Sequence, residues 1–224
     1  MTAPRYPHGP SSRAVLIGAS MFADGDLPSI PAVRNNLDAL HRALTHPRHG
    51  LLAPEHCRVL PDPGDQRAVG AALDWAAREA GDMLLVYYAG HGLLDEDGRL
   101  YLALTGTDPA RPGFTSVPLE LVQRDLARAH ANSRIMLLDC CFSGRAVAAM
   151  GGSHTVFAGQ LDLTGTYTLT STTSTAPSHA PPGARHTAFT SALLDALAQE
   201  KPLTLDGIYQ HVDRELAGLG LPRP

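Results

Sequence analysis

The sequence predicts an α/β fold in which a mainly parallel central sheet is flanked by helices. Short runs of aliphatic and β-branched residues, typical of buried strands, alternate with longer segments whose apolar residues repeat every three or four positions. Clusters of Asp, Gly, Pro and Ser separate the two kinds of segment. The 224 residues, 44% of them apolar, are enough for one large domain with its own core.

The first half of the chain alternates regularly between predicted strands and helices. It begins with a Pro-, Gly- and Ser-rich segment over 1–12, which we expect to be a flexible arm. The Asp-Pro-Gly-Asp turn over 62–65 follows a strand and can cap the next helix. The predicted elements are a strand over 14–18, a loop over 19–31, a helix over 32–44, a strand over 58–60, a helix over 67–80 and a strand over 83–88.

The second half continues this alternation but contains two long irregular segments. Asp97 and Gly98 favour a hairpin turn over 95–98, because glycine adopts the positive φ angles of tight turns. Residues 145–165 are rich in Gly and Ala without periodicity, and 172–186 form a polar loop. The predicted elements are the segment 99–104 after the hairpin turn, strands over 134–139 and 167–171, and helices over 118–131, 187–199 and 204–216.

Composition argues against several classes of function. The net charge is −4, and Lys201 is the single lysine among 18 basic residues, with no basic block, so we expect no nucleic-acid partner. No apolar stretch reaches the roughly 18 residues that cross a bilayer, so no membrane association is expected. The N-terminus lacks an apolar secretion segment, which predicts a cytoplasmic protein.

Two strands of the predicted sheet end in motifs with reactive side chains. The strand over 84–88 is followed by Ala-Gly-His-Gly, which contains His91. The strand over 134–138 is followed by Asp-Cys-Cys-Phe-Ser-Gly, which contains Cys140 and Cys141. In an open parallel sheet, the loops beyond the carboxyl ends of the strands form the ligand crevice. Neighbouring strand tips would therefore place an imidazole beside a thiol, as a cysteine nucleophile requires.

This pair predicts acyl transfer to a cysteine, followed by hydrolysis. His91 would act as the general base, because the thiolate is the reactive form of cysteine. The nucleophile is Cys141 or, alternatively, Cys140, and the backbone amides of Gly92 and Cys141 are candidates for holding the oxyanion. Cys57 is predicted to be a small buried strand residue, and three cysteines are too few for a disulfide framework.

The two motifs resemble those of the caspase/metacaspase clan of cysteine proteases (peptidase C14-like). The metacaspase cysteine motif is Asp-Ser-Cys-His-Ser-Gly, which implies that Cys141 is the nucleophile and His91 the base. A His-to-Cys spacing of about 50 residues is a known property of caspases. Residues 15–18 resemble the family's first strand and 188–194 its Phe-Thr helix start, so the resemblance covers 13–217. It is strongest to bacterial caspase-like proteases of conflict or immune systems.

The resemblance implies one caspase-like sandwich domain over 13–217, with a tail over 218–224, and cleavage after a selected P1 residue. Metacaspases bind Arg or Lys at P1 through acidic groups, and Asp139 matches one of these. An alternative reading of this carboxylate is a helix- or loop-capping role. The chain has Asn36 and Ala89 where the family has acidic and serine residues, so its pocket carries less negative charge.

Other acidic residues bear on specificity and on metal binding. Asp24 or Asp26, in the first long loop, could restore an S1 carboxylate. Many metacaspases require calcium, which binds six to eight oxygen atoms. A solvated hairpin turn explains the acidic residues near 95–98 better, so we predict no metal and no other cofactor. The residues that could supply oxygens are Asp95, Glu96, Asp97 and Asp108.

These observations predict a cysteine endopeptidase with a Cys-His dyad that cleaves a protein or peptide substrate after Arg or Lys. The resemblance implies an effector of a bacterial defence or cell-death system, with a sensor or regulator on a separate chain. Two alternatives remain: a caspase-fold interaction module that does not cut, and a thiol amidase or acyltransferase with a closed pocket for a small substrate.

Overall fold

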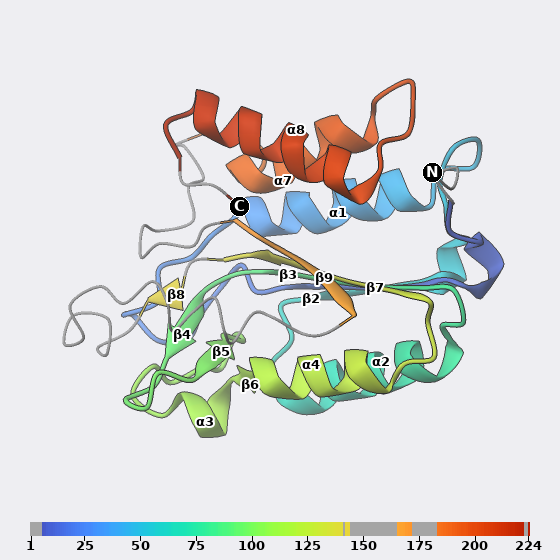
Figure 1. The fold of residues 1–224 in the computed structure, drawn as a ribbon. Coiled ribbons are helices and arrows are strands. Elements are labelled where there is room, and N and C mark those ends of the chain that lie inside the picture. Colours follow the sequence, from blue (N-terminus) through green and yellow to red (C-terminus); the bar gives the residue numbers. More distant parts are fainter. Residues whose placement is uncertain (1–5, 141, 144–164, 172–182, 222–223) are drawn as a thin grey trace.

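The centre of the computed structural model, which describes residues 6–140, 142–143, 165–171, 183–221 and 224, is a five-stranded sheet. Its strands are all parallel, in the order β2-β1-β3-β7-β9 (Figure 1). This confirms the predicted α/β fold with a mainly parallel sheet. The strands are β1 (Arg13–Gly18), β2 (Cys57–Pro61), β3 (Met83–Ala89), β7 (Ser133–Asp139) and β9 (Thr166–Thr170).

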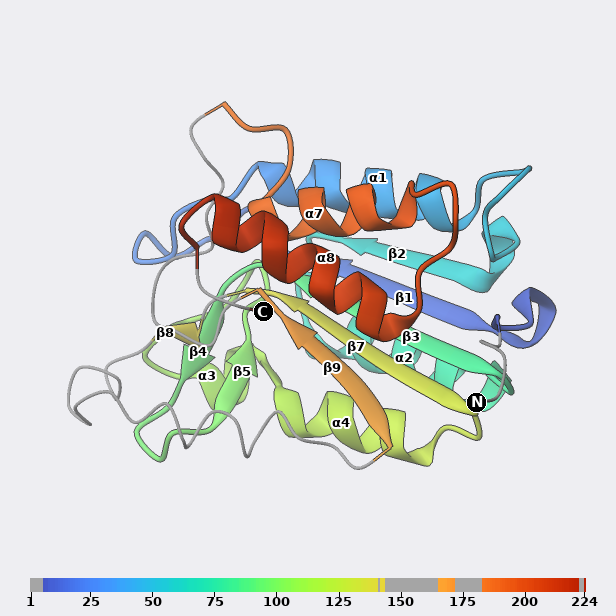
Figure 2. The same cartoon turned by 45° about the horizontal axis from the view of Figure 1, so that its top comes forward.

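Helices cover both faces of this sheet (Figures 1 and 2). Helices α1, α7 and α8 lie over one face, and α2 and α4 over the other. The predicted turn over 62–65 caps α2, since the carboxylate of Asp65 accepts hydrogen bonds from the amides of Arg67 and Ala68. The helices are α1 (Ala32–Leu44), α2 (Gln66–Glu79), α4 (Leu119–Arg128), α7 (Ala188–Leu197) and α8 (Leu205–Gly218).

A second, four-stranded sheet follows the carboxyl end of β3, in the order β6-β5-β4-β8. The predicted hairpin turn over 95–98 joins its strands β4 and β5, which pair antiparallel. The predicted helix over 118–131 is too long, because Pro118 pairs with β5 and Ala129 adopts an extended conformation. The second sheet and the short helix beside it consist of β4 (Gly92–Leu94), β5 (Leu100–Leu102), α3 (Pro112–Thr115), β6 (Val117–Pro118) and β8 (Phe142–Ser143).

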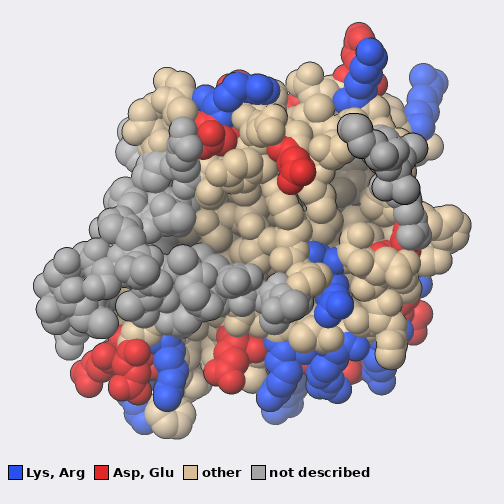
Figure 3. All heavy atoms as spheres, in the orientation of Figure 1, with Lys and Arg blue, Asp and Glu red and all other residues tan. Residues whose placement is uncertain are grey.

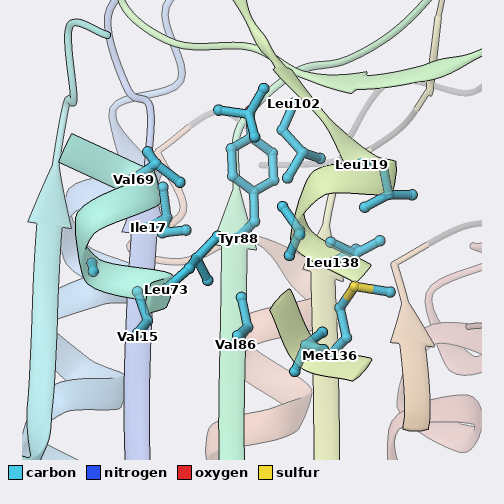
Figure 4. Packing of buried hydrophobic residues seen from close by; sticks show 14 of the residues in the cluster. Val15, Ile17, Val69, Leu73, Val86, Tyr88, Leu102, Leu119, Met136 and Leu138 are labelled. Atoms are coloured by element: carbon cyan, nitrogen blue, oxygen red, sulfur yellow. The ribbon is translucent and has the colours of Figure 1, made fainter. Parts of the chain in front are cut away.

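Side chains alternate between the two faces along each central strand, as the pleat requires. Along β1, β3 and most of β7 both faces are buried, which explains why these three strands are mainly apolar runs. Figure 4 shows the face that packs against α2 and α4, where Val69 and Leu73 of α2 meet the sheet. The strand residues on this face are Val15, Ile17, Val86, Tyr88, Met136 and Leu138, and those on the other face include Leu16, Leu85, Tyr87 and Leu137.

The segment predicted as a flexible arm is described from residue 6, and its second half is bonded to the body of the protein. The amide of His8 donates to Asp82 at 2.6 Å, and the carbonyl of Ser11 accepts from the amides of Gly81 and Asp82. These bonds tie residues 8–11 to the turn that precedes β3.

The outer surfaces of α2 and α4 carry charges of both signs (Figure 3). The pairs there, Arg78 with Asp74 and Arg128 with Asp125, are exposed, and such pairs contribute about 1 kcal/mol or less to stability. None of the helices in the described part of the chain is long and apolar enough to span a membrane.

Candidate active site

The two motifs lie on adjacent strands. β3 and β7 are neighbours with Ala89 opposite Asp139, so both strands end at the same edge of the sheet. Beyond this edge, β4 pairs in parallel with β8, with Gly92 opposite Phe142. Cys141 lies outside the described residues. The backbone on both sides of it nevertheless runs beside the backbone that carries His91.

The turn into His91 requires glycine at position 90. Gly90 has a φ of +155°, and a Cβ atom there would lie 2.5 Å from the hydroxyl oxygen of Tyr88. That hydroxyl is fully buried and lies 2.8 Å from the carbonyl oxygens of both His91 and Ala103. The Tyr88 hydroxyl therefore fixes the backbone of His91, and only glycine at position 90 leaves room for this hydroxyl.

We expect Gly90→Ala to destabilise the protein by about 1–3 kcal/mol, because the added methyl group would displace the Tyr88 hydroxyl. Urea unfolding followed by circular dichroism measures this change. Gly70→Ala is the matched control: Gly70 lies inside α2, and a Cβ there meets no atom within 4 Å. That substitution should stabilise the protein by about 0.5–1 kcal/mol. Equal midpoints for the Gly90 variant and the wild type would contradict the tight turn.

The imidazole of His91 is held in one tautomer. Its Nε2 atom lies 2.8 Å from the carbonyl oxygen of Pro28, in the loop between β1 and α1. A carbonyl oxygen only accepts hydrogen bonds, so Nε2 carries the proton and Nδ1 keeps its lone pair. The ring of Phe22 packs against the imidazole, with centroids 4.8 Å apart. Burial lowers the pKa of His91, and this lowering favours the neutral form that a general base requires. The bond to Pro28 acts in the opposite direction but is outweighed by burial.

Asp139 is one of the most deeply buried carboxylates among the described residues, with 2% of its surface exposed. Its Oδ2 atom accepts hydrogen bonds from Tyr87, Thr187, Thr190 and Asn36. Its Oδ1 atom is buried and has no partner in the described part of the chain. Burial raises the pKa of Asp139, and the bonds from Thr187, Thr190 and Tyr87 oppose this shift.

The hydrogen bonds around Asp139 connect four elements. Thr187 is the N-cap of α7, where its hydroxyl accepts from the amide of Thr190. Asn36 of α1 donates to the Thr187 hydroxyl at 2.9 Å, and its carbonyl oxygen lies 3.3 Å from Nδ1 of His186. The carboxylate of β7 thus holds β3, α1 and the start of α7 together. Sequence reasoning identified Asp139 and Asn36 but missed Tyr87, Thr187 and Thr190.

The two other predicted S1 carboxylates lie in the loop that carries Pro28. Asp24 accepts a hydrogen bond from the amide of Asp26 at 2.8 Å, which closes a local turn. Asp26 is exposed. No hydrogen bond or ion pair between described residues connects either carboxylate to Asp139, and their role in S1 stays a prediction.

Two of the three cysteines are packed in the interior. Cys140 has no exposed surface and belongs to the cluster between the sheet and the α2–α4 layer. Cys57 is buried in β2 as predicted, and burial raises the pKa of its thiol to about 12. An inaccessible thiol cannot reach a substrate, so both positions suit packing. The assignment of Cys141 as the nucleophile stays a prediction.

The acidic residues considered for calcium show no metal centre. No group of three or more His, Cys, Asp or Glu side chains that could hold a metal occurs among the residues described. The carboxylate of Asp95 instead accepts from the amide of Arg99 and the hydroxyl of Tyr101, both at 2.8 Å. Its oxygens thus serve the β4–β5 hairpin.

A family model for the caspase domain matches residues 11–222. The chain belongs to the caspase family. It is therefore a cysteine-type peptidase. Caspase-1 from Spodoptera frugiperda superposes with a TM-score of 0.63 at 18% identity, over 97% of this chain and 81% of that one. Protein GSU0716 from Geobacter sulfurreducens gives 0.64 at 15% identity, over 92% and 89%. At identities this low, the TM-scores show a likeness of fold alone. No curated protein sequence matches the chain.

Proposed function

We propose that this caspase-family protein is an endopeptidase in which Cys141 is the nucleophile and His91 the general base. The observation that carries the proposal is the pairing of β4 with β8, which runs the chain beyond His91 alongside the chain beyond Cys141. The bond to Pro28 supports it further, because it leaves Nδ1 of His91 available to accept a proton.

In the proposed reaction, the thiol of Cys141 gives its proton to Nδ1 of His91. The sulfur then forms a bond to the carbonyl carbon of the substrate, and the backbone amides of Gly92 and Cys141 donate hydrogen bonds to the oxyanion. His91 passes the proton to the departing amine as the peptide bond breaks. Water, deprotonated by His91, attacks the resulting thioester, releasing the acid product and restoring the thiol.

We infer a preference for Arg or Lys at P1, with Asp139 as the acidic group of the pocket. The support is its Oδ1 atom, which is buried without a hydrogen-bond partner among described residues. A guanidinium or ammonium group would supply the missing donors and would offset the cost of burying the charge. Asp24 and Asp26 remain proposed contributors to the same pocket.

Peptide substrates that differ only at P1, carrying Arg, Lys, Asp or Ala before a fluorogenic group, test this function. We expect kcat/KM for Arg to exceed that for Asp by about a hundredfold or more, with equal rates in calcium and in a chelator. Preference for Asp would overturn the proposed pocket. Failure of the folded protein to cleave any peptide would favour the interaction module, and turnover of small amides alone would favour the thiol amidase.

We also propose that the protein acts in the cytoplasm as an effector of a bacterial defence or cell-death system, regulated by a separate chain. This proposal rests on the resemblance of its motifs to bacterial conflict-system proteases. Expression of the wild type with its genomic neighbours in a bacterial host should arrest growth, and Cys141→Ala should not. Equal growth of the two strains under every activating condition tried would contradict this role.

A further inference from the structure

A second carboxylate, Asp62, lies next to the loop over 19–31, whose Pro28 carbonyl bonds to His91. It follows β2 directly and has a φ of +49°, a left-handed conformation that Asp adopts more readily than most residues. Its amide donates to the carbonyl of Gly18 at 2.7 Å, which places it beside the end of β1. The side chain is 14% exposed and reaches the point where the loop over 19–31 leaves the sheet.

The carboxylate of Asp62 connects the two ends of this loop. At the first end, Oδ1 accepts from the amides of Ser20 at 2.6 Å and Met21 at 3.3 Å. At the second end, Arg34 in the first turn of α1 contacts Oδ2 through Nε at 2.8 Å and Nη2 at 2.6 Å. The Ser20 hydroxyl lies between the two groups, donating to the carboxylate and accepting from Arg34 at 3.2 Å.

The same loop delivers the carbonyl that orients His91. The amide of Ile30 donates to the carbonyl of Ser20 at 2.8 Å, so the segment after Pro28 is tied directly to the residue that Asp62 holds. Leu27, just before Pro28, is buried in the same apolar cluster as Leu93 of β4. Two sets of contacts therefore position the Pro28 carbonyl. One is the apolar cluster that Leu27 shares with β4, and the other is the set of hydrogen bonds through which Asp62 joins the two ends of the loop.

We propose that Asp62, paired with Arg34, is a positioning residue for the catalytic histidine. Asp62 and Arg34 form a clamp that joins the two ends of the 19–31 loop. This loop carries the Pro28 carbonyl, which keeps the proton of His91 on Nε2. Charge-assisted hydrogen bonds suit this task, since they are shorter and stronger than neutral ones. The role of Asp62 rests on the proposed function of His91 as general base.

The clamp requires Asp62 to be ionised, because its carboxylate accepts the hydrogen bonds from Ser20, Met21 and Arg34. Burial acts to raise the pKa of Asp62, but the bonds from Ser20, Arg34 and Met21 outweigh it, and the pKa is lowered. Asp62→Asn keeps the size and the tolerance for positive φ, but it places an NH₂ group against either Arg34 or the backbone amides. That variant removes the clamp with little change of volume.

The test compares Asp62→Asn, Arg34→Gln and the control Asp74→Asn, which removes the exposed ion pair on α2. NMR of ¹⁵N-histidine-labelled protein reports the His91 tautomer, with the signal assigned by its loss in His91→Ala. We expect a single Nε2–H form in the wild type and control, and a mixture of tautomers in Asp62→Asn. With Arg peptides, kcat should fall up to about a hundredfold in Asp62→Asn, with little change in KM. Arg34→Gln should give a smaller effect in the same direction.

These readouts separate failure of the clamp from failure of the peptidase function. If folded Asp62→Asn and Arg34→Gln keep the wild-type tautomer and kcat, the positioning role is wrong. If the wild type cleaves no peptide yet Asp62→Asn alters the tautomer, the clamp stands and the proposed function fails. A fall in kcat with an unchanged tautomer would also overturn the proposal, because Asp62 would then act by another route.

Discussion

Cys141→Ala and His91→Ala should each abolish peptide cleavage, with kcat falling by roughly four to six orders of magnitude. The proposed nucleophile and base act as one unit, so removing either one removes the covalent pathway. For the same reason, the double variant should be no slower than the slower single variant. Initial rates with the preferred P1 peptide, measured at high enzyme concentration, provide the comparison. Additive losses in the double variant would mean that the two residues act independently.

The other cysteines provide the controls for this experiment. Cys57→Ala and Cys140→Ala remove buried thiols, one in β2 and one in the layer beside α2, and each should change kcat less than tenfold. Both substitutions create small cavities, so their thermal midpoints need to be measured alongside the rates. A Cys140→Ala variant that is folded but inactive, with Cys141→Ala still active, would assign the nucleophile to Cys140.

The parts of the site that could be predicted from sequence are those in which side-chain identity and strand order carry the information. His91 and the Asp-Cys-Cys motif follow apolar runs that are typical of buried strands, and adjacent parallel strands bring such ends to one edge. The two-residue period also explains the split between Tyr87, Tyr88 and the motif after β7. Tyr87 shares a face with Asp139, and Tyr88 shares a face with Cys140.

The parts that could not be predicted depend on the backbone or on short elements. The group that orients His91 is the carbonyl of Pro28, and every residue has a carbonyl, so no motif marks it. Strands β6 and β8 have two residues each, which is too short for a periodic pattern. The link between Asp62 and Arg34 joins segments 28 residues apart that only the parallel pairing of β1 and β2 brings together.

The two readings of Asp139 considered from sequence, an S1 carboxylate and a capping group, are compatible in the structure. Oδ2 bonds to the N-cap residue of α7, Thr187, and serves the fold, whereas Oδ1 is left without a described partner. A residue that supports a helix start with one oxygen can present the other to a substrate. Such a group costs stability when its charge is buried without a cation, which is typical of functional sites.

Asp139→Asn should therefore abolish the preference for Arg at P1. It should also make the substrate-free protein more stable at neutral pH. The raised pKa of Asp139 means that its contribution to stability is greatest below the ordinary Asp range and is lost as the pH rises through the folded-state pKa. The amide has no such titration. The thermal midpoint of the variant minus that of the wild type should therefore increase as the pH rises from about 4 to 7, since the ordinary Asp pKa is about 3.9.

Thermal unfolding at several pH values and P1 profiling of the same samples test the two halves of this prediction together. We expect kcat/KM for the Arg peptide to fall by about a hundredfold or more, and that for the Ala peptide to change little. Asp195→Asn, which alters an exposed carboxylate on α7, is the matched control and should change neither property. A variant that is less stable at pH 7 yet still prefers Arg would show that Asp139 serves only to hold α7 against the sheet, and the basic P1 pocket would have to be sought elsewhere.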